Sequence, residues 1–204
     1  MGMDRSSQRE ILQGTGNPFL IWLGKVMLKL PGWKLKGTFP DLPRLVVIVA
    51  PHTSNWDFYF GLAAKFILGI KAHWLGKHTL FRWPIRRLLI GLGGIPIDRN
   101  KQSGVVDHLV TLFQQRKTMI LGLAPEGTRR LTSRWKTGFY YTALKANVPI
   151  LMGYIDYLKK EVGIGPLIHP SGDMQKDFEI IREFYRNVVP KNPDQFALPD
   201  PEQL

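Results

Sequence analysis

Residues 45–57 read LVVIVAPHTSNWD, an apolar run that passes directly into polar residues. A continuous β-branched run over 45–50 is typical of a strand buried on both faces of a parallel sheet. The polar residues after it predict a turn, and then a helix that starts near Ser54. His52 is therefore expected just beyond the carboxyl end of a buried strand.

The rest of the chain alternates apolar runs with segments of helical spacing. A second buried strand is predicted over 119–123, and it ends at a second polar motif, residues 124–129. Further extended pieces are predicted at 95–97 and 148–152, and a short strand or turn at 73–76. Helices are predicted at 18–30, 58–68, 84–92, 104–115, 138–146 and 177–188. This alternation predicts an α/β fold with a mixed, largely parallel central sheet flanked by helices. Ligands in such folds gather outside the strand ends.

The first predicted helix, over 18–30, is amphipathic and basic. Asn17 suits its N-cap and Pro18 its first turn. At ~1.5 Å per residue the helix measures roughly 20 Å, well short of the ~30 Å hydrocarbon core of a bilayer. We expect it to lie on a membrane surface and to contact it through Phe19, Trp22, Lys25 and Lys29. The alternative is a helix docked on the protein's own core.

A chain of 204 residues suits one domain with a small appendage. We expect the appendage to be residues 1–36, a lead-in followed by the membrane-surface helix, and the main domain to be residues 37–204. No cysteine is present, which excludes disulfides, thiolate metal sites and a cysteine nucleophile. No signal peptide is evident, and the cytoplasmic side is the expected location.

The charge balance is strongly basic, with 28 Lys and Arg against 16 Asp and Glu and a net charge of +12. Much of the surplus lies between Lys71 and Lys136, in and around the two polar motifs. Such a surplus predicts an anionic partner. No zinc-finger spacing, aromatic RNA-binding signature or basic zipper is present, so a nucleic acid is not expected. An anionic membrane surface and a phosphorylated small molecule remain.

The first polar motif offers a general base and a carboxylate. If His52 sits in the turn and Asp57 in the first helical turn, the carboxylate can point back at the imidazole. Asp57 would then fix the tautomer of His52 and stabilise the imidazolium that forms as His52 takes a proton from a substrate hydroxyl. The alternative is structural, since residues 54–57 also fit a capping box with Asp in place of Glu.

The second polar motif offers a tight turn with an arginine. Gly127 permits close backbone approach, and Arg129 can hold a phosphate by paired hydrogen bonds. Glu126 repels phosphate when ionised, so it is expected to orient an arginine or the acceptor's hydroxyls. The alternative is a plain turn with a surface salt bridge.

The polar motifs of this chain resemble those of the glycerophospholipid acyltransferases of the 1-acylglycerol-3-phosphate acyltransferase type. The resemblance rests on four blocks in order, namely His52-x4-Asp57, GIPIDR at 94–99, PEGTR at 125–129 and VPI at 148–150. Two minor signatures accompany them, Lys77-x2-Leu80-Phe81-x2-Pro84 and Lys136-x-Gly138. Departures from the family pattern at Pro51, Pro96, Ala124 and Arg130 lie near the acceptor side, so they bear on the acceptor more than on the reaction.

The resemblance implies acyl transfer from acyl-CoA or acyl carrier protein to the free hydroxyl of a lysophospholipid, 1-acylglycerol-3-phosphate. It makes His52 the general base and Asp57 its orienter. It places the acceptor in a pocket formed by Lys77, Arg99, Glu126, Gly127, Thr128 and Arg129. No metal and no tightly bound cofactor is implied, and membrane-associated N-terminal helices are typical of the family. A peripheral protein on the cytoplasmic face of the cell membrane is the resulting expectation.

Three alternatives to this function stay open from the sequence. The same chemistry could act on another acceptor, such as glycerol 3-phosphate, a different lysophospholipid or a lyso-aminolipid. A non-catalytic module could bind anionic lipid through its basic residues. A hydrolase could use His52 and Asp57 to activate water, and it would consume acyl-CoA without an acceptor.

Overall fold

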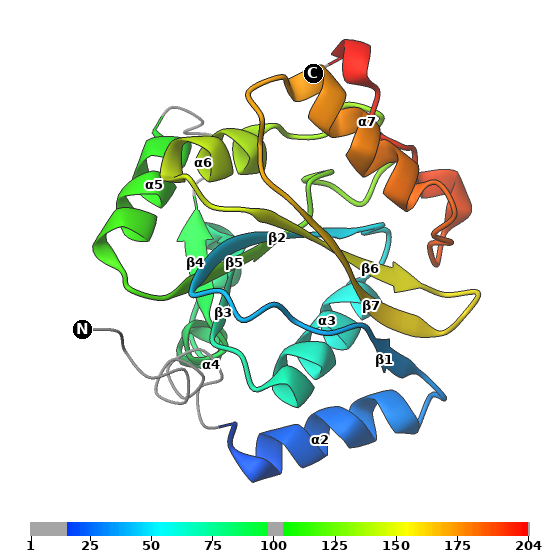
Figure 1. Ribbon diagram of the computed structural model, residues 1–204. Coiled ribbons are helices and arrows are strands. Elements are labelled where there is room, and N and C mark those ends of the chain that lie inside the picture. The colour runs from blue at the N-terminus through cyan, green and yellow to red at the C-terminus, as the bar shows by residue number, and fades with distance from the viewer. Residues whose placement is uncertain (1–15, 98–103, 204) are drawn as a thin grey trace.

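The computed structural model describes residues 16–97 and 104–203, and its centre is a seven-stranded sheet in the order β1-β7-β6-β2-β5-β3-β4 (Figure 1). Strands β2, β3, β4, β5 and β6 run parallel, whereas β7 is antiparallel to β6 and β1 is parallel to β7. The strands are β1 Lys34–Lys36, β2 Arg44–Ala50, β3 Ala72–Lys77, β4 Gly94–Ile97, β5 Met119–Leu123, β6 Ile150–Asp156 and β7 Glu161–Ile168. The predicted α/β class with a mixed, largely parallel sheet is confirmed.

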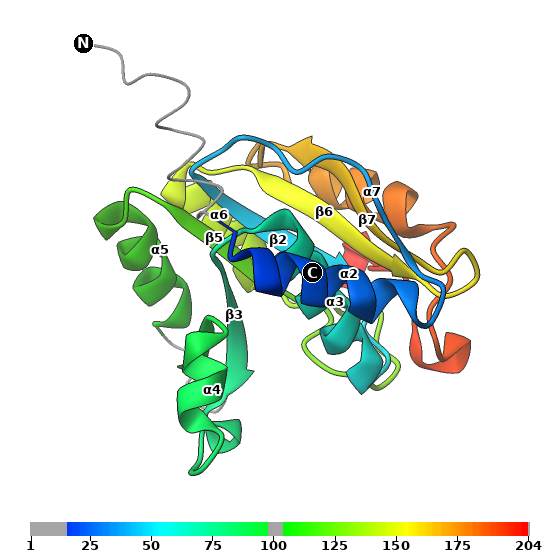
Figure 2. The same cartoon turned by 90° about the horizontal axis from the view of Figure 1, so that it is seen from below.

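Helices cover both faces of the sheet (Figures 1 and 2). The described α-helices are α2 Pro18–Lys29, α3 Asn55–Leu68, α4 Arg86–Gly91, α5 Val105–Gln115, α6 Gly138–Ala146 and α7 Met174–Tyr185. Helices α5, α6 and α7 share one hydrophobic core with β2, β5 and β6. Helices α2 and α3 form a second core against β6 and β7. Short 3-10 turns in the described residues lie at His78–Leu80, Pro193–Gln195 and Pro201–Gln203.

Strand β2 holds the central place because it carries the longest β-branched run. It pairs with β5 on one side and β6 on the other, with Val46 opposite Leu121 and Ile48 opposite Met152. The side chains of Val46 and Ile48 are fully buried, as expected for a strand covered on both faces. The sequence after β2 is therefore held on a rigid, central support.

Helix α2 packs against α3 through a small residue. A Cβ on Gly24 would lie 2.7 Å from the carbonyl oxygen of Ala63, so only glycine allows this approach. Tyr59 of α3 adds a hydrogen bond of 3.1 Å from its hydroxyl to Met27 O. The opposite side of α2 exposes Phe19, Trp22, Lys25 and Lys29. The helix thus docks on the protein with one face and leaves the other open, and contact of that open face with a membrane stays a prediction.

The described part of the predicted appendage packs onto the rest of the chain. Strand β1 pairs with β7, and the Trp33 ring stacks on Phe60 of α3 at 3.7 Å between centroids. In the described ranges, no helix has both the length and the apolar character to cross a bilayer.

Strand β7 was not predicted from the sequence, and its composition explains why. Gly163, Gly165 and Pro166 read as turn residues. The structure needs glycine at 163, since a Cβ there would lie 1.9 Å from the Tyr154 ring on β6. Contact with a neighbouring strand therefore overrides the local preference. Helix α3 starts at Asn55, which agrees with the start expected near Ser54 and extends the helical segment predicted at 58–68. Helix α7 spans Met174–Tyr185 rather than 177–188.

Candidate active site

Three strands deliver polar side chains to one edge of the sheet. Strands β5 and β6 both run parallel to β2, so the carboxyl ends of all three meet at the same edge. His52 follows β2, Glu126 follows β5 and Tyr157 follows β6. The structure thereby joins two motifs whose contacting residues, His52 and Glu126, are 74 positions apart in the sequence.

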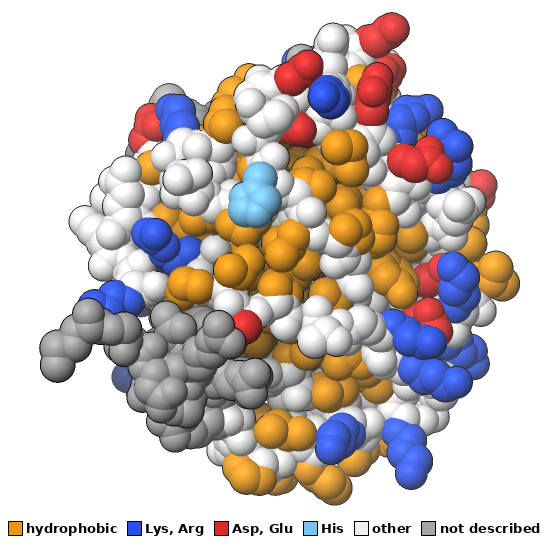
Figure 3. All heavy atoms as spheres, in the orientation of Figure 1, with side chains coloured by type: hydrophobic (Ala, Val, Ile, Leu, Met, Phe, Trp, Pro, Cys, Tyr) orange, Lys and Arg blue, Asp and Glu red, His pale blue; other side chains and the backbone are white. Residues whose placement is uncertain are grey.

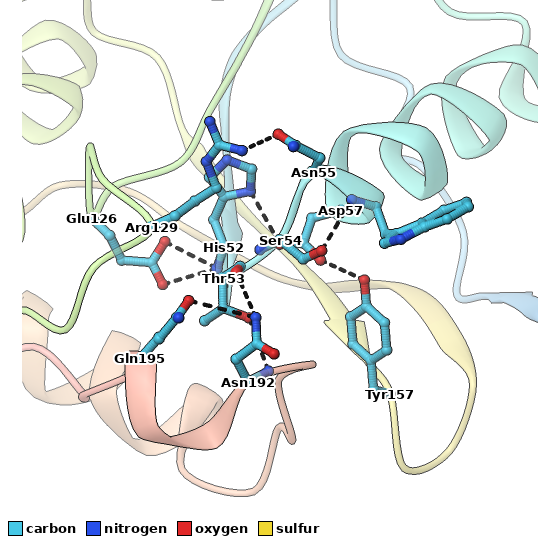
Figure 4. Close-up of polar contacts among 11 residues, drawn as sticks. His52, Thr53, Ser54, Asn55, Asp57, Glu126, Arg129, Tyr157, Asn192 and Gln195 are labelled. Carbon is cyan, nitrogen blue, oxygen red and sulfur yellow. Dashed lines mark hydrogen bonds and ion pairs between the residues drawn. The ribbon is translucent and has the colours of Figure 1, made fainter.

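His52 and Asp57 face each other across the turn between β2 and α3 (Figure 4). Nδ1 of His52 lies 3.3 Å from Oδ2 of Asp57. The Asp57 side chain is 2% exposed and the His52 side chain 28%, so the imidazole is the accessible member of the pair. With Nδ1 turned toward Asp57, Nε2 is the ring nitrogen that can take a proton from a bound hydroxyl.

Asp57 also holds the start of α3. Its Oδ2 accepts a hydrogen bond of 2.7 Å from Ser54 N, and Ser54 Oγ accepts one of 3.2 Å from Trp56 N. These contacts belong to the capping box that the sequence offered as the alternative to a catalytic pair. The two interpretations are compatible, because one carboxylate caps the helix and faces His52 at the same time.

Tyr157 is a further partner of Asp57. Its hydroxyl donates a hydrogen bond of 2.6 Å to Asp57 Oδ1. Burial and the Asp57 carboxylate raise the pKa of Tyr157 well above its usual value, so the hydroxyl stays a donor at neutral and moderately alkaline pH. Sequence reasoning missed Tyr157, which is 100 positions from Asp57. The signal that could have found it is its place at the end of a strand that reaches the same edge.

Glu126 supports His52 from the other motif. Both of its carboxyl oxygens lie 3.0 Å from the backbone N–H of His52, which donates to them. Burial raises the pKa of Glu126 to about 8, and the nearby Asp57 carboxylate adds to the increase. With this pKa, Glu126 is mostly protonated at neutral pH and so carries little negative charge. The sequence suggested an arginine or the acceptor's hydroxyls as its partners, whereas the structure pairs it with this backbone N–H.

The turn after Glu126 brings an arginine to the first residue of α3. Gly127 has a φ of +66°, and a Cβ on it would lie 3.0 Å from Lys136 Cγ, so the turn requires glycine. Arg129 Nη1 donates a hydrogen bond to Asn55 Oδ1. Arg129 and the positive end of the α3 dipole therefore act at the same place, where an anion is stabilised.

Lys77 and Thr128, two further predicted site residues, make no direct hydrogen bond or ion pair with His52. Lys77 ends β3, a neighbour of β5, so it lies at the same edge with an exposed side chain. Thr128 Oγ1 accepts a hydrogen bond of 3.1 Å from Arg130 N within its own turn. Arg99 lies outside the described residues.

The C-terminal segment packs against the turn that carries His52, which sequence reasoning did not foresee. Asn192 N donates to Thr53 Oγ1 at 3.2 Å, and Asn192 Nδ2 donates to Thr53 O at 2.9 Å. In the amide orientation that satisfies both of its polar atoms, Gln195 donates to Thr53 O at 3.1 Å and to Arg129 O at 3.0 Å. One short segment therefore contacts both motifs. Figure 4 shows Asn192 beside Thr53.

Two other kinds of site were looked for in the described residues, a metal cluster and a groove, and neither involves this edge. No three His, Asp or Glu side chains come together as metal ligands within 16–97 and 104–203. A groove of about 770 Å³ lies between α7 and the C-terminal residues, and its lining contains none of the predicted site residues. The edge that carries His52 is therefore the candidate active site.

Comparisons with known proteins bear on what this edge does. The sequence model of the family described as "Acyltransferase" matches residues 39–155, which include His52, Asp57 and the PEGTR turn. A search of curated proteins finds no significant match. Among solved structures, the 1-acyl-sn-glycerophosphate (LPA) acyltransferase PlsC from Thermotoga maritima is similar, with a TM-score of 0.55 and 16% sequence identity over 84% of this chain and 75% of that one.

The structural likeness shows a shared fold, and the family match spans more than half of the chain. Both agree with the resemblance carried by the four sequence blocks. The chain belongs to the acyltransferase family.

Proposed function

We propose that this acyltransferase moves a fatty acyl group from acyl-CoA or acyl carrier protein to the free hydroxyl of 1-acylglycerol-3-phosphate. The observation that carries the proposal is the geometry of His52, which turns Nδ1 toward a buried carboxylate at 3.3 Å and keeps an accessible imidazole. The structurally similar PlsC is named for an acceptor of this kind, 1-acyl-sn-glycerophosphate.

In the proposed reaction, His52 Nε2 takes the proton of the acceptor hydroxyl as that oxygen attacks the thioester carbonyl carbon. Asp57 stabilises the imidazolium through Nδ1. When the C–S bond breaks, the imidazolium returns its proton to the departing thiolate. The acyl group then forms an ester with the acceptor, and the thiol leaves.

The acceptor phosphate is assigned to the positive end of α3. Arg129 lies there beside Asn55, and Lys77 lies at the same edge of the sheet. We include Arg99 and Thr128 with them, as the family resemblance implies. Because Glu126 is neutral at neutral pH, it can shape this pocket without repelling the phosphate.

The protein is proposed to work as a peripheral protein on the cytoplasmic face of the cell membrane. The exposed side of α2 carries two aromatic and two basic residues, a composition suited to the interface of an anionic bilayer, namely Phe19, Trp22, Lys25 and Lys29. A lipid acceptor would then reach the site without leaving the membrane surface.

The test is release of free CoA from a long-chain acyl-CoA in detergent micelles, with and without lysophosphatidic acid. We expect acceptor-dependent release that falls at least roughly a hundredfold in His52→Ala, the scale of a lost general base. The matched control is His108→Ala, since His108 is exposed on α5. Release without any acceptor would indicate a hydrolase. Competition by glycerol 3-phosphate or other lysolipids would identify a different acceptor, and no turnover with any acceptor or donor would indicate a binding module.

A further inference from the structure

The segment from Leu80 to Ile90, here named the α4 segment, exposes an unusual amount of apolar surface. Trp83 is 91% exposed and Leu88 62%. The large apolar side chains exposed in this segment are Leu80, Trp83, Ile85, Leu88 and Ile90. Soluble proteins expose single apolar residues commonly but contiguous groups rarely, and such groups mark interaction sites.

The protein holds this segment firmly while leaving its side chains outside. Helix α4 itself contains no buried residue. Its end is fixed through Leu92, whose carbonyl oxygen accepts hydrogen bonds from Lys65 Nζ at 2.6 Å and from Trp74 Nε1 at 3.1 Å. Its beginning is fixed by Phe81, which is buried and stacks on Trp74. The exposed apolar surface is therefore part of an anchored element.

The positive charge around the α4 segment favours an anionic partner. Residues 58–97 contain six Lys and Arg and no Asp or Glu. Three of the six alternate with the apolar side chains of the α4 segment and are exposed, namely Arg82, Arg86 and Arg87. By contrast, residues 173–202 hold seven of the sixteen acidic residues. Figure 3 shows acidic side chains gathered at the end of the molecule that carries α7 and the C-terminus. Basic residues are thus concentrated around the α4 segment, and acidic residues around α7 and the C-terminus.

The α4 segment also lies close to the edge that carries the site. It follows β3, whose carboxyl end reaches the same edge as His52. Figure 2 shows the arrow of β3 pointing toward the tip from which α4 returns. In Figures 1 and 2 α4 lies on the same side of the molecule as the first turns of α2.

We propose that the α4 segment is a second membrane-contact surface, which inserts Trp83, Ile85 and Leu88 into the interface of an anionic bilayer. Arg82, Arg86 and Arg87 bind the lipid phosphates. Tryptophan with aliphatic residues and arginine is the composition of protein surfaces that lie at the bilayer interface. The inference rests on the proposed function, because a lipid acceptor would enter from the leaflet that the α4 segment touches.

The absence of natural cysteine allows a direct test in the full chain. Leu88→Cys is labelled with an environment-sensitive fluorophore and mixed with vesicles of phosphatidylcholine and phosphatidylglycerol. We expect a blue shift and at least roughly a doubling of emission, with little change on pure phosphatidylcholine. The matched control is Ile180→Cys, since Ile180 is also an exposed aliphatic residue but lies on α7. An unchanged Leu88 label on vesicles that bind the protein would overturn the proposal.

A second measurement compares the vesicle affinity of two triple variants that have the same net charge. The triple variant Arg82→Gln, Arg86→Gln, Arg87→Gln should lose about tenfold or more in affinity for phosphatidylglycerol vesicles, since each basic residue near an anionic surface adds measurably to binding. The control triple variant replaces cations on α6, α7 and the turn after α7, with Lys145→Gln, Lys176→Gln and Arg186→Gln. Equal loss in the two triple variants would show that only net charge matters, and it would contradict a localised contact.

Two further results would assign the apolar surface to another occupant. A label at Leu88 that responds to protein concentration without vesicles would indicate a second copy of the chain. If deletion of residues 1–15 changes the emission of the label without vesicles, residues 1–15 would be the occupant of the apolar surface. In detergent micelles the Arg82, Arg86 and Arg87 variant should keep its acyl transfer, so failure of the membrane contact is distinguishable from failure of the proposed reaction.

Discussion

Asp57 shows how one buried carboxylate can cap a helix and face an accessible histidine at the same time. Its Oδ2 accepts from Ser54 N and faces His52, while its Oδ1 accepts from the Tyr157 hydroxyl. A buried charge is tolerated only when hydrogen bonds and charges compensate it. The same contacts fix the direction of the carboxylate, so the orientation of His52 depends on the Ser54 N–H and the Tyr157 hydroxyl as well as on Asp57 itself.

Removing the Tyr157 hydroxyl should therefore lower turnover with little effect on substrate binding. We expect kcat of Tyr157→Phe to fall about tenfold, equivalent to about 1.4 kcal/mol, with KM nearly unchanged. The pKa of Tyr157 is raised, so the hydroxyl is present throughout the neutral range and the loss should not vary with pH there. Steady-state kinetics in detergent micelles at several pH values measures kcat, KM and their dependence on pH.

The control for this variant is Tyr59→Phe. Tyr59 also donates one hydrogen bond from its hydroxyl, but to Met27 O in the contact between α3 and α2. We expect a small loss of stability in that variant and an unchanged kcat. Equal effects of the two substitutions on kcat would argue that Tyr157 acts only through general stability.

Sequence reasoning reached His52 and Asp57 but not Tyr157, for a physical reason. The first two lie within one strand, turn and helix start, where local patterns are informative. Tyr157 joins them only through the pairing of β2 with β6, which is a long-range property of the sheet. The capping and catalytic interpretations of Asp57 could not be separated from sequence because both require the same turn.

At the scale of elements, local patterns predicted best where packing agrees with them. Strand β5 and helix α6 have the predicted bounds, and both are buried against the first core. Strand β7 was missed because close contact with Tyr154 requires glycine at 163. No helix or strand was predicted for the segment that contains Asn192. Its hydrogen bonds to the His52 turn are long-range contacts, which no periodic pattern in the sequence reports.

Substitutions in the C-terminal segment should accordingly lower stability and kcat, although no residue of this segment is proposed to take part in the reaction. Asn192→Ala removes one hydrogen bond to Thr53 O, and we expect a loss of about 1 kcal/mol in the free energy of unfolding. Adding Gln195→Ala takes away the second donor to this oxygen, and the total loss should reach about 2 kcal/mol. Denaturant unfolding and kcat measure the two effects, and kcat should fall most in the double variant.

A substitution of the same kind outside this contact is Asn187→Ala. Asn187 is exposed in the turn after α7, and its replacement should leave stability and kcat unchanged. If the double variant behaved like Asn187→Ala, the segment would be a passive neighbour of the turn rather than its support.

The whole molecule combines two features, a sheet edge that carries His52 and a surface on which charge is unevenly distributed. The carboxyl ends of β2, β5 and β6 place His52, Glu126 and Tyr157 together, and this arrangement follows from sheet order rather than from any one segment. The surface charge instead can be read from the sequence, because exposure of Lys and Arg is the rule. Charge therefore predicted an anionic partner, whereas the support of the site had to come from the structure.

Glu126 links the site to the stability of the whole chain. Its pKa is about 8 in the folded protein against 4.5 as the reference for an unfolded chain. Between these values the folded state keeps a proton that the unfolded state has released, so the free energy of unfolding should fall as pH rises, by up to about 1.4 kcal/mol per pH unit. The contribution is fully present below pH 4.5 and is lost as pH passes through about 8.

Glu126→Gln isolates this contribution, because a glutamine resembles the neutral acid and its oxygen can still accept from the N–H of His52. We expect the wild type to lose stability relative to this variant between pH 4.5 and about 8, measured by urea unfolding at a series of pH values. Glu179→Gln, at an exposed position on α7, should follow the wild type. Parallel curves for wild type and Glu126→Gln would mean that Glu126 is ionised in the folded protein. The acceptor phosphate would then meet a negative charge beside His52, and its binding would have to rely more heavily on Arg129.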